Sequence, residues 1–303
     1  MSSENKIENI FIIGGTGNIG STVVRVLIKN QINVTLLARS IEKVNKLFEN
    51  EKDIENIKII ESNYKDIEKI KNNIDNNKYD RLFLLTTEEM ADDTDYIIEL
   101  AKIFYESCCK QIVFISSLGI TFPYRTYNIG YKLRIIEDGI LNEADKRKKY
   151  FVALRPGQFF SNQLWTSNVI KNESIIFSSG DSETKATWID TDDIANFATN
   201  ILLDDIEKHE CFVYELGSEV LTHKQRAILF SNILNCEIKF VKYDIKKMYD
   251  SLIKIGFSHV NAYNLSEIMT RDVDNFTPGI ELILGRKPKT MKTWIEENKD
   301  KFM

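Results

Sequence analysis

The chain has 303 residues, of which 43% are hydrophobic and 28% charged, and its net charge is −5. This length and apolar content predict one large domain, or a large and a small one, around a real core. The negative charge argues against direct nucleic-acid binding, because such a surface repels a phosphate backbone. No apolar run reaches the about 18 residues of a membrane span, and the polar start "MSSENKIEN" lacks a signal peptide's apolar stretch, so we expect a cytoplasmic protein.

Short apolar runs alternate with helical stretches along the first half of the chain. Strands are expected at residues 10–14, 33–39, 57–62, 80–87, 110–117 and 150–157, and helices at 18–30, 40–50, 66–76, 95–107 and 128–143. Continuous apolar strands separated by helices indicate a parallel sheet with both faces covered. With right-handed crossovers, this predicts an α/β fold with a doubly wound parallel Rossmann sheet.

The pattern loosens beyond residue 155. Residues 180–204 and 211–218 still indicate a helix and strands, and the rest indicates short helices around one more strand at 238–243. We therefore predict a Rossmann domain over residues 1–155, to which the chain returns at about 186–217. Residues 156–185 and 218–303 would form a smaller, mainly helical substrate or cap region.

Four of the 13 glycines fall between residues 14 and 20, directly after the first expected strand. Gly14, Gly17 and Gly20 form a GxxGxxG pattern. One glycine lets the chain turn sharply, another lets the backbone approach a pyrophosphate, and a third lets the helix pack close to the strand. The start of the helix then directs free amides and a positive dipole end at the phosphates. The pattern predicts dinucleotide binding, with a purely structural turn as the alternative.

The end of the second strand, "LLARS", indicates which dinucleotide binds. A site selective for NAD carries an acid about 20 residues after the glycines, where it bonds the ribose 2′-hydroxyl. Here Arg39 stands 19 residues after Gly20 with no acid beside it, and Ser40 and Lys43 follow. Because an arginine fork suits a 2′-phosphate, we predict NADP(H) in preference to NAD(H). A solvated arginine at a strand end is the alternative.

Cysteine and histidine give no sign of a metal site. Cys108 and Cys109 are neighbours, and the other two cysteines lie far along the chain. They fit neither a disulfide framework nor a metal-ligand spacing, and the three histidines are scattered. We expect reduced thiols and no bound metal.

The order of motifs resembles that of NmrA-like proteins, a branch of the atypical short-chain dehydrogenase/reductases (SDRs). The motifs are "GGTGNIG", "LLARS", "LLTT", "VFISSLG", "LRPGQFFSNQ", "ATWIDTDDIA", "VYELGS" and the ending "LGRKPKTMKTWIEENKD". Within this branch the chain looks most like quinone oxidoreductases of type 2 and ergot-alkaloid (festuclavine or agroclavine) dehydrogenases.

The resemblance implies a cofactor that lies across the carboxyl ends of the strands. The pyrophosphate would be held by Gly14, Thr16, Gly17, Asn18 and Ile19. The 2′-phosphate would meet Arg39, Ser40 and Lys43, and the adenine would lie near Asn63. The path to the nicotinamide ribose would be lined by Thr86 and Thr87, with Phe159 and Phe160 near the nicotinamide.

Typical SDRs use a serine, a tyrosine and a lysine four residues after the tyrosine, which lowers the tyrosine's pKa for proton exchange. Ser116 and Ser117 end the fifth strand, at the expected place. Lys132, however, lies five residues after Tyr127, and Asn128 stands four before it. A five-residue step on a helix turns Tyr127 and Lys132 onto different faces, so we predict that the dyad is absent. Both remain catalytic candidates, and Lys132 could bond the nicotinamide ribose, act as a base, or be a surface lysine.

Without the dyad, two functional classes stay open. A quinone or an iminium is already electrophilic, so its reduction by hydride needs mainly orientation and a dry site. The first class, which we favour, is an NAD(P)H-dependent reductase of such a small-molecule acceptor. The second is a non-catalytic NAD(P) redox sensor that regulates a protein partner. An aromatic wall would suit a flat acceptor; its candidates, which could equally be core, are Phe122, Tyr124, Tyr127, Trp165 and Trp188.

Overall fold

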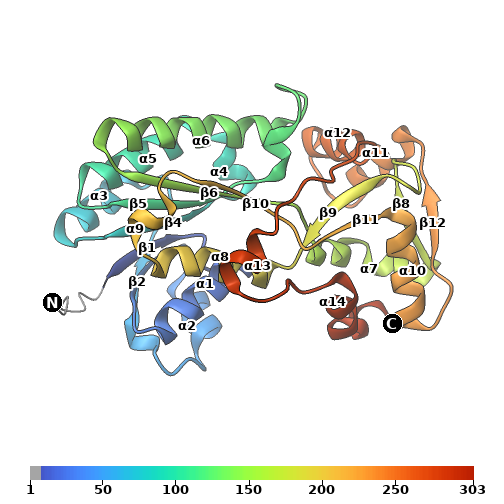
Figure 1. Cartoon of the computed structure of the whole chain (residues 1–303), viewed down its shortest axis with the longest axis horizontal. Coiled ribbons are helices and arrows are strands. Elements are labelled where there is room, and N and C mark those ends of the chain that lie inside the picture. The colour runs from blue at the N-terminus through green and yellow to red at the C-terminus, as the bar shows by residue number, and fades with distance from the viewer. Residues whose placement is uncertain (1–7) are drawn as a thin grey trace. The chain divides into compact units, whose positions relative to one another are not determined.

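The computed structural model describes residues 8–303, and these divide into two compact units (Figure 1). The first unit runs to Thr121 and also contains Ile129–Arg155 and Ile194–Tyr214. The second contains Phe122–Asn128, Pro156–Asp193 and Glu215–Met303. Across residues 8–303, none of the helices combines the length and the apolar character that a bilayer crossing requires.

The first unit is built on a seven-stranded sheet in the order β10-β6-β5-β4-β1-β2-β3. Its strands are β1 (Asn9–Ile13), β2 (Asn33–Ala38), β3 (Ile57–Glu61), β4 (Arg81–Leu85), β5 (Gln111–Ile115), β6 (Tyr150–Pro156) and β10 (Val213–Leu216). Neighbouring strands from β6 to β3 pair in parallel. The prediction of a doubly wound parallel α/β sheet is confirmed.

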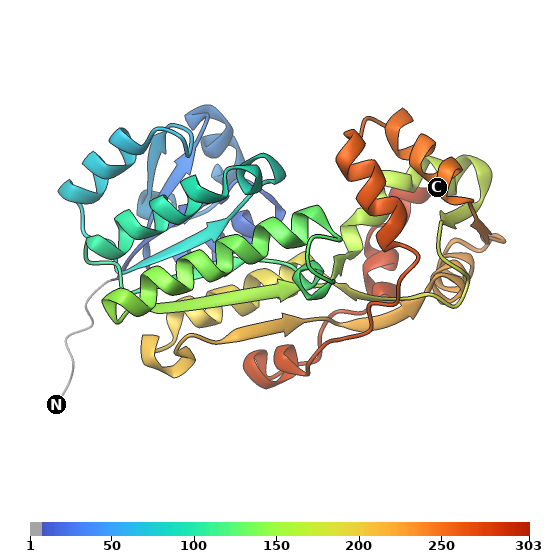
Figure 2. The same ribbon diagram turned by 90° about the horizontal axis from the view of Figure 1, so that it is seen from above.

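Helices cover both faces of this sheet (Figure 1). One face carries α3, α5 and α6, which lie side by side in Figure 2, and the other carries α1 and α8. The helices mainly in this unit are α1 (Asn18–Lys29), α2 (Ile41–Phe48), α3 (Ile67–Asn76), α4 (Glu88–Asp92), α5 (Thr94–Glu106), α6 (Asn128–Arg147), α8 (Thr191–Leu203) and α9 (Ile206–His209). Because α4 is only five residues long, it has too few positions to show a helical period in the sequence.

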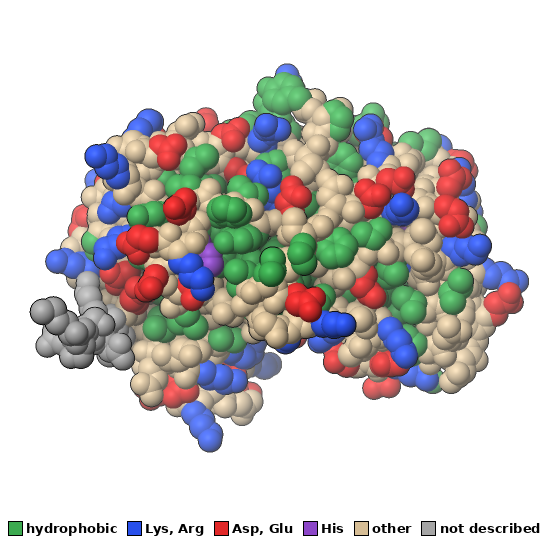
Figure 3. All heavy atoms as spheres, in the orientation of Figure 1, with side chains coloured by type: hydrophobic (Ala, Val, Ile, Leu, Met, Phe, Trp, Pro, Cys, Tyr) green, Lys and Arg blue, Asp and Glu red, His purple; other side chains and the backbone are tan. Residues whose placement is uncertain are grey.

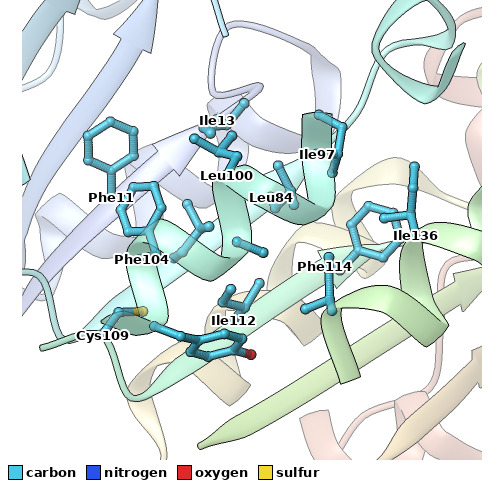
Figure 4. Close-up of a cluster of buried hydrophobic side chains, with 14 of the residues drawn as sticks. Phe11, Ile13, Leu84, Ile97, Leu100, Phe104, Cys109, Ile112, Phe114 and Ile136 are labelled. Carbon is cyan, nitrogen blue, oxygen red and sulfur yellow. The ribbon is translucent and has the colours of Figure 1, made fainter. Parts of the chain in front are cut away.

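The strands alternate their apolar side chains between the two faces of the sheet. Phe11 and Ile13 of β1 face α5, where they join Leu100 and Phe104 in a cluster of fully or nearly fully buried side chains (Figure 4). The ring of Phe11 meets that of Phe104 edge-on, with centroids 4.9 Å apart. Ile10 and Ile12 are completely buried as well. Strands buried on both sides explain the continuous apolar runs in the sequence.

The second unit contains two small sheets and several helices. The strands β7 (Gln158–Phe159), β9 (Lys185–Ile189) and β11 (Glu219–Thr222) form one sheet, and β8 (Ile175–Ser178) pairs with β12 (Lys239–Lys242) in the other. Its helices are α7 (Ser167–Glu173), α10 (His223–Leu234), α11 (Ile245–Lys254), α12 (His259–Ile268), α13 (Gly279–Leu284) and α14 (Met291–Glu297). The return to the first unit therefore begins at Ile194, later than about residue 186, because β9 pairs with β7 and β11.

Charge is mixed over the face of the molecule drawn in Figure 3. Acidic and basic side chains are interspersed there in each unit, and apolar side chains reach the surface between them. On that face the basic side chains do not form one continuous patch.

Candidate functional site

The loop after β1 lies where the strand order of the sheet reverses. β1 has β2 on one side and β4 on the other, and open parallel sheets bind ligands at such a switch point. Because parallel strands end at one edge of a sheet, the residues that follow them gather there. Arg39 follows β2, Thr86 follows β4, and Ser116 follows β5. This edge of the first unit is the candidate site.

Three of the four loop glycines are required by the fold itself. Gly14 has φ +89°, and a Cβ there would lie 2.7 Å from the carbonyl oxygen of Leu85. A Cβ on Gly20 would lie 2.2 Å from the carbonyl oxygen of Gly14, and one on Gly15 would lie 2.3 Å from Cδ1 of Leu36. All three distances are shorter than side chains tolerate.

Gly17 differs from its neighbours. Its backbone is extended (φ −88°, ψ 177°), and the nearest atom to an added Cβ would be the carbonyl oxygen of Gly14, at an ordinary 3.6 Å. The protein's own packing therefore has room for a side chain at this exposed position. The glycine keeps open the space in front of α1, as a close-lying pyrophosphate requires.

The first turn of α1 offers backbone donors to that space. Gly17 is the N-cap and has no side chain that could accept from them, and the first turn contains no acid. The first bond of the helix runs from the Ser21 N–H to the Gly17 carbonyl oxygen (2.8 Å), which leaves the amides of residues 18–20 without helical partners. Ile19 is only 4% exposed, so its side chain is buried and only its backbone amide is in a position to contact a ligand. These amides and the helix dipole suit an anion.

The segment after β2 carries exposed basic side chains. Across the described residues 8–303, Arg39 has no hydrogen-bond or ion-pair partner, so its guanidinium is available to a ligand. Ser40 is the N-cap of α2, and its hydroxyl accepts a hydrogen bond from the Lys43 N–H (3.1 Å). Ser40 is thus already used in the fold, while the Lys43 side chain extends into solvent.

An acid reaches this place from the neighbouring strand, which sequence reasoning missed. Glu61 ends β3 opposite Ala38 of β2, and its Oε1 accepts a hydrogen bond from the Ile41 N–H at 3.1 Å. The expectation of no acid beside Arg39 along the chain stands; across the sheet, the Glu61 carboxylate lies at the Ile41 N–H, two residues after Arg39. The strand pairing that brings the carboxylate here leaves no signal near Arg39 in the sequence.

The loop after β3 is held by its own side chains. Asn63 accepts a hydrogen bond from the Lys65 N–H through Oδ1 (2.8 Å), which leaves its amide group to donate. Asp93 accepts from the Tyr64 hydroxyl and pairs with Lys65, both at 2.8 Å. The hydrogen bonds from Lys65 and Tyr64 lower the pKa of the Asp93 carboxyl. These contacts tie the loop to the start of α5 and fix where Asn63 lies.

The hydroxyls after β4 and β5 differ in how far the fold already uses them. Thr87 caps α4 by accepting from the N–H three residues later (3.3 Å), and Ser117 accepts from the N–H two residues later (3.0 Å). Thr86 is half-buried. Ser116 is 6% exposed, and its hydroxyl has no partner within the described residues. Of the two serines, Ser116 is therefore the one whose hydroxyl the described part of the fold leaves without a partner, although that hydroxyl is buried.

The two catalytic candidates fall into different environments. Lys132 lies in the first turns of α6 and forms an ion pair with Asp92 at the end of α4. Tyr127 precedes α6, belongs to the second unit and packs edge-on against Phe122. Because Tyr127 is outside the helix, the argument from helix faces does not apply to it.

The aromatic candidates have separate packing partners. Phe160 is completely buried in the core of the second unit beside Trp294, so its expected place near a nicotinamide is wrong for the side chain. Trp188 is 2% exposed, whereas Trp165 is 59% exposed and packs edge-on against Phe257. Core packing accounts for Phe160 and Trp188.

The second unit contains a buried charge that the sequence did not indicate. The Arg226 guanidinium lies 4.6 Å from the ring centre of Trp188 and contacts Gln163 Oε1 (2.7 Å) and His223 Nδ1 (3.1 Å). Burial lowers the pKa of Arg226 to about 10. Burial and the nearby guanidinium lower the pKa of His223 to about 4.

A doubly wound sheet with a glycine turn and an open helix start defines a dinucleotide-binding α/β protein. The family model described as NAD(P)H-binding matches residues 14–205. The chain belongs to this NAD(P)H-binding family. A curated relative, the uncharacterized oxidoreductase YesF of Bacillus subtilis, is 22% identical over 93% of this chain and 92% of its own length.

Several solved structures share the fold. The NADPH-dependent quinone oxidoreductase QOR2 of Escherichia coli, complexed with NADPH, has a TM-score of 0.81 at 16% identity, covering 96% of this chain and 99% of its own. The Citrobacter sp. triphenylmethane reductase complexed with NADP(H) has a TM-score of 0.79 at 14% identity, and the match covers 96% of this chain and 99% of that one. NmrA, a negative transcriptional regulator, in complex with NAD has a TM-score of 0.78 at 14% identity, and the match covers 96% of this chain and 95% of that one. At these identities the likeness concerns the fold.

Proposed function

We propose that the chain is an NADPH-dependent reductase of an activated acceptor of the quinone or iminium type. The binding of NADPH is supported mainly by Gly17. The fold leaves room for a side chain at this position, yet the sequence has none there. The amides at the start of α1 fit the pyrophosphate, and the exposed Arg39 fits the 2′-phosphate that distinguishes NADP(H) from NAD(H). When bound, NADPH supplies a hydride.

The residues of the candidate site have distinct roles in this proposal. The backbone of residues 14–19 binds the pyrophosphate, together with the Thr16 hydroxyl. Arg39 and Lys43 bind the 2′-phosphate, while Ser40 holds the start of α2 in place. Asn63 donates to the adenine through its free amide group. Thr86, Thr87 and Lys132 line the path toward the nicotinamide ribose.

The acceptor class follows from what the catalytic residues can do. Asn128 stands where the SDR dyad has its tyrosine, and Lys132 is engaged with Asp92. A simple ketone would need a proton donor for the alkoxide, whereas a quinone or a cationic imine needs mainly orientation and exclusion of water. The Ser116 hydroxyl can donate one hydrogen bond to an acceptor oxygen. The names of QOR2, a quinone oxidoreductase, and of a triphenylmethane reductase linked to the bioremediation of triphenylmethane dyes support this class.

A redox sensor that regulates a protein partner is the second candidate. It is favoured by the same missing tyrosine and by the shared fold of NmrA. A sensor would bind the dinucleotide through the same loop and would not turn it over.

The test is a panel of quinones, cationic dyes, imines, enones and simple ketones, with NADPH oxidation followed by absorbance. The reductase proposal expects turnover of a quinone or a cationic acceptor, little activity on ketones, and no activity in Gly17→Val. Calorimetric binding of NADPH without turnover of any acceptor would favour the sensor. Rapid turnover of a ketone that is lost in Tyr127→Phe would show that the inferred acceptor class is wrong.

A further inference from the structure

The starts of α1 and α2, the helices that follow β1 and β2, differ in whether the chain's own side chains cap their backbone amides. At α1 the N-cap is a glycine and the first turn contains no acid. At α2 the Ser40 hydroxyl accepts from the Lys43 N–H, the Glu61 carboxylate accepts from the Ile41 N–H, and the first turn contains Glu42. The start of α2 therefore already holds an anion that belongs to the chain.

The Glu61 carboxylate lies at the end of the site where the 2′-phosphate of NADP(H), which NAD(H) lacks, would bind. Glu61 is opposite Ala38, and Arg39 is the next residue of the chain. Within the described residues the carboxylate forms no ion pair with Arg39, so it leaves that guanidinium uncovered while holding a negative charge at the Ile41 N–H, two residues further along the chain. The Lys69 ammonium bonds the backbone carbonyl oxygen of Glu61 and not its carboxylate. A 2′-phosphate brought to Arg39 adds nearly two further negative charges.

We propose that Glu61 is a specificity-determining residue that limits the preference for NADP(H), so that the site also accepts NAD(H). The inference rests on the proposed use of Arg39 as the 2′-phosphate site. Arg39 attracts the phosphate, and Glu61 repels it and occupies one of the backbone donors of α2 that would otherwise bind it. A ribose 2′-hydroxyl carries no charge and meets no such repulsion.

Glu61→Gln is the matched substitution, because the amide oxygen can still accept from the Ile41 N–H while the charge is removed. Calorimetry with NADPH and NADH measures the ratio of their dissociation constants. We expect Glu61→Gln to tighten NADPH about threefold to tenfold at low salt and to change NADH less than about twofold, with the gain shrinking at high salt. Glu49→Gln at the other end of α2 removes the same charge and should leave the ratio unchanged.

An unchanged ratio in Glu61→Gln, alongside a weakening of NADPH by Arg39→Ala, would overturn this inference and leave the proposed function standing. An equal gain in Glu49→Gln would overturn it too, because net charge would then be the cause. Failure of Arg39→Ala to weaken NADPH would overturn the 2′-phosphate site and, with it, both proposals.

Discussion

Gly17→Val is expected to abolish cofactor binding in a protein that stays folded. The backbone at Gly17 is already extended, and an added Cβ would have its nearest neighbour at 3.6 Å. Replacing a glycine N-cap by an apolar residue costs about 1 kcal/mol, and the loss of chain entropy in the unfolded state offsets about 0.4–1 kcal/mol of that. The free energy of unfolding should therefore change by about 1 kcal/mol or less, which corresponds to a shift in Tm of about 2–4 °C.

The effect on binding is much larger, because the side chain fills the space that the pyrophosphate needs. Displacing the phosphates from two backbone amides costs about 1.5–3 kcal/mol for each hydrogen bond to the charged group. The Kd for NADPH should therefore rise at least about 100-fold. Gly20→Ala is the contrasting variant: its Cβ would lie 2.2 Å from a carbonyl oxygen, so it should destabilise the protein itself by about 3 kcal/mol or more.

Thermal melting with and without NADPH distinguishes these outcomes. A ligand at 100 times its Kd stabilises the folded state by about 2.7 kcal/mol, and this gain should disappear in Gly17→Val. Calorimetric titration then gives the Kd directly. A Gly17→Val protein that keeps the full stabilisation by NADPH would refute the assignment of the loop. One that unfolds like Gly20→Ala would refute the inference that the fold leaves room there.

Three further outcomes are expected. Arg39→Ala should raise the Kd of NADPH about 10- to 100-fold and barely change that of NADH, whereas equal losses in calorimetry would contradict the 2′-phosphate site. Lys132→Ala should weaken both cofactors alike, because the nicotinamide ribose is common to them; a loss confined to NADPH would contradict this role. The fold lowers the pKa of His223 from 6.5 in the unfolded chain to about 4, so the native state holds this side chain neutral. The free energy of unfolding should therefore fall by roughly 3 kcal/mol as the pH drops from about 6.5 to about 4. Denaturant titration at several pH values measures this fall. This fall should be reduced in His223→Gln, and an identical pH profile in that variant would refute the cause.

The five inner strands of the large sheet could be predicted because they are buried on both faces. Runs such as "IFII" of β1 and "LFLL" of β4 are continuous, and the observed ends lie within one or two residues of the predicted ones. The glycine loop could be predicted because its four glycines lie within seven positions directly after a strand, although the atoms that require Gly14 and Gly15 belong to Leu85 and Leu36, far along the chain. Arg39 follows directly from its position after β2.

The features that were missed depend on residues far apart in the chain. β7 has two residues and exists because Gln158 and Phe159 pair with β9 some 30 residues later. Glu61 reaches the start of α2 only through the register of β2 with β3. Arg226 looks like an ordinary helix residue until the fold places it over Trp188. Local patterns cannot indicate such contacts, since strand register and tertiary packing decide them.

The contrast between α1 and α2 separates affinity from specificity in this site. The pyrophosphate is common to both dinucleotides, and in the proposed site it would meet the backbone amides at the start of α1, which no side chain of the loop caps. The 2′-phosphate is present in one of them, and at α2 the chain's own Ser40 and Glu61 already occupy backbone donors. In the proposed site, discrimination would therefore fall to the side chains of Arg39 and Lys43, opposed by the Glu61 charge. It follows that substitutions at the start of α1 should change the affinity for both cofactors together, whereas substitutions at the ends of β2 and β3 should change their ratio.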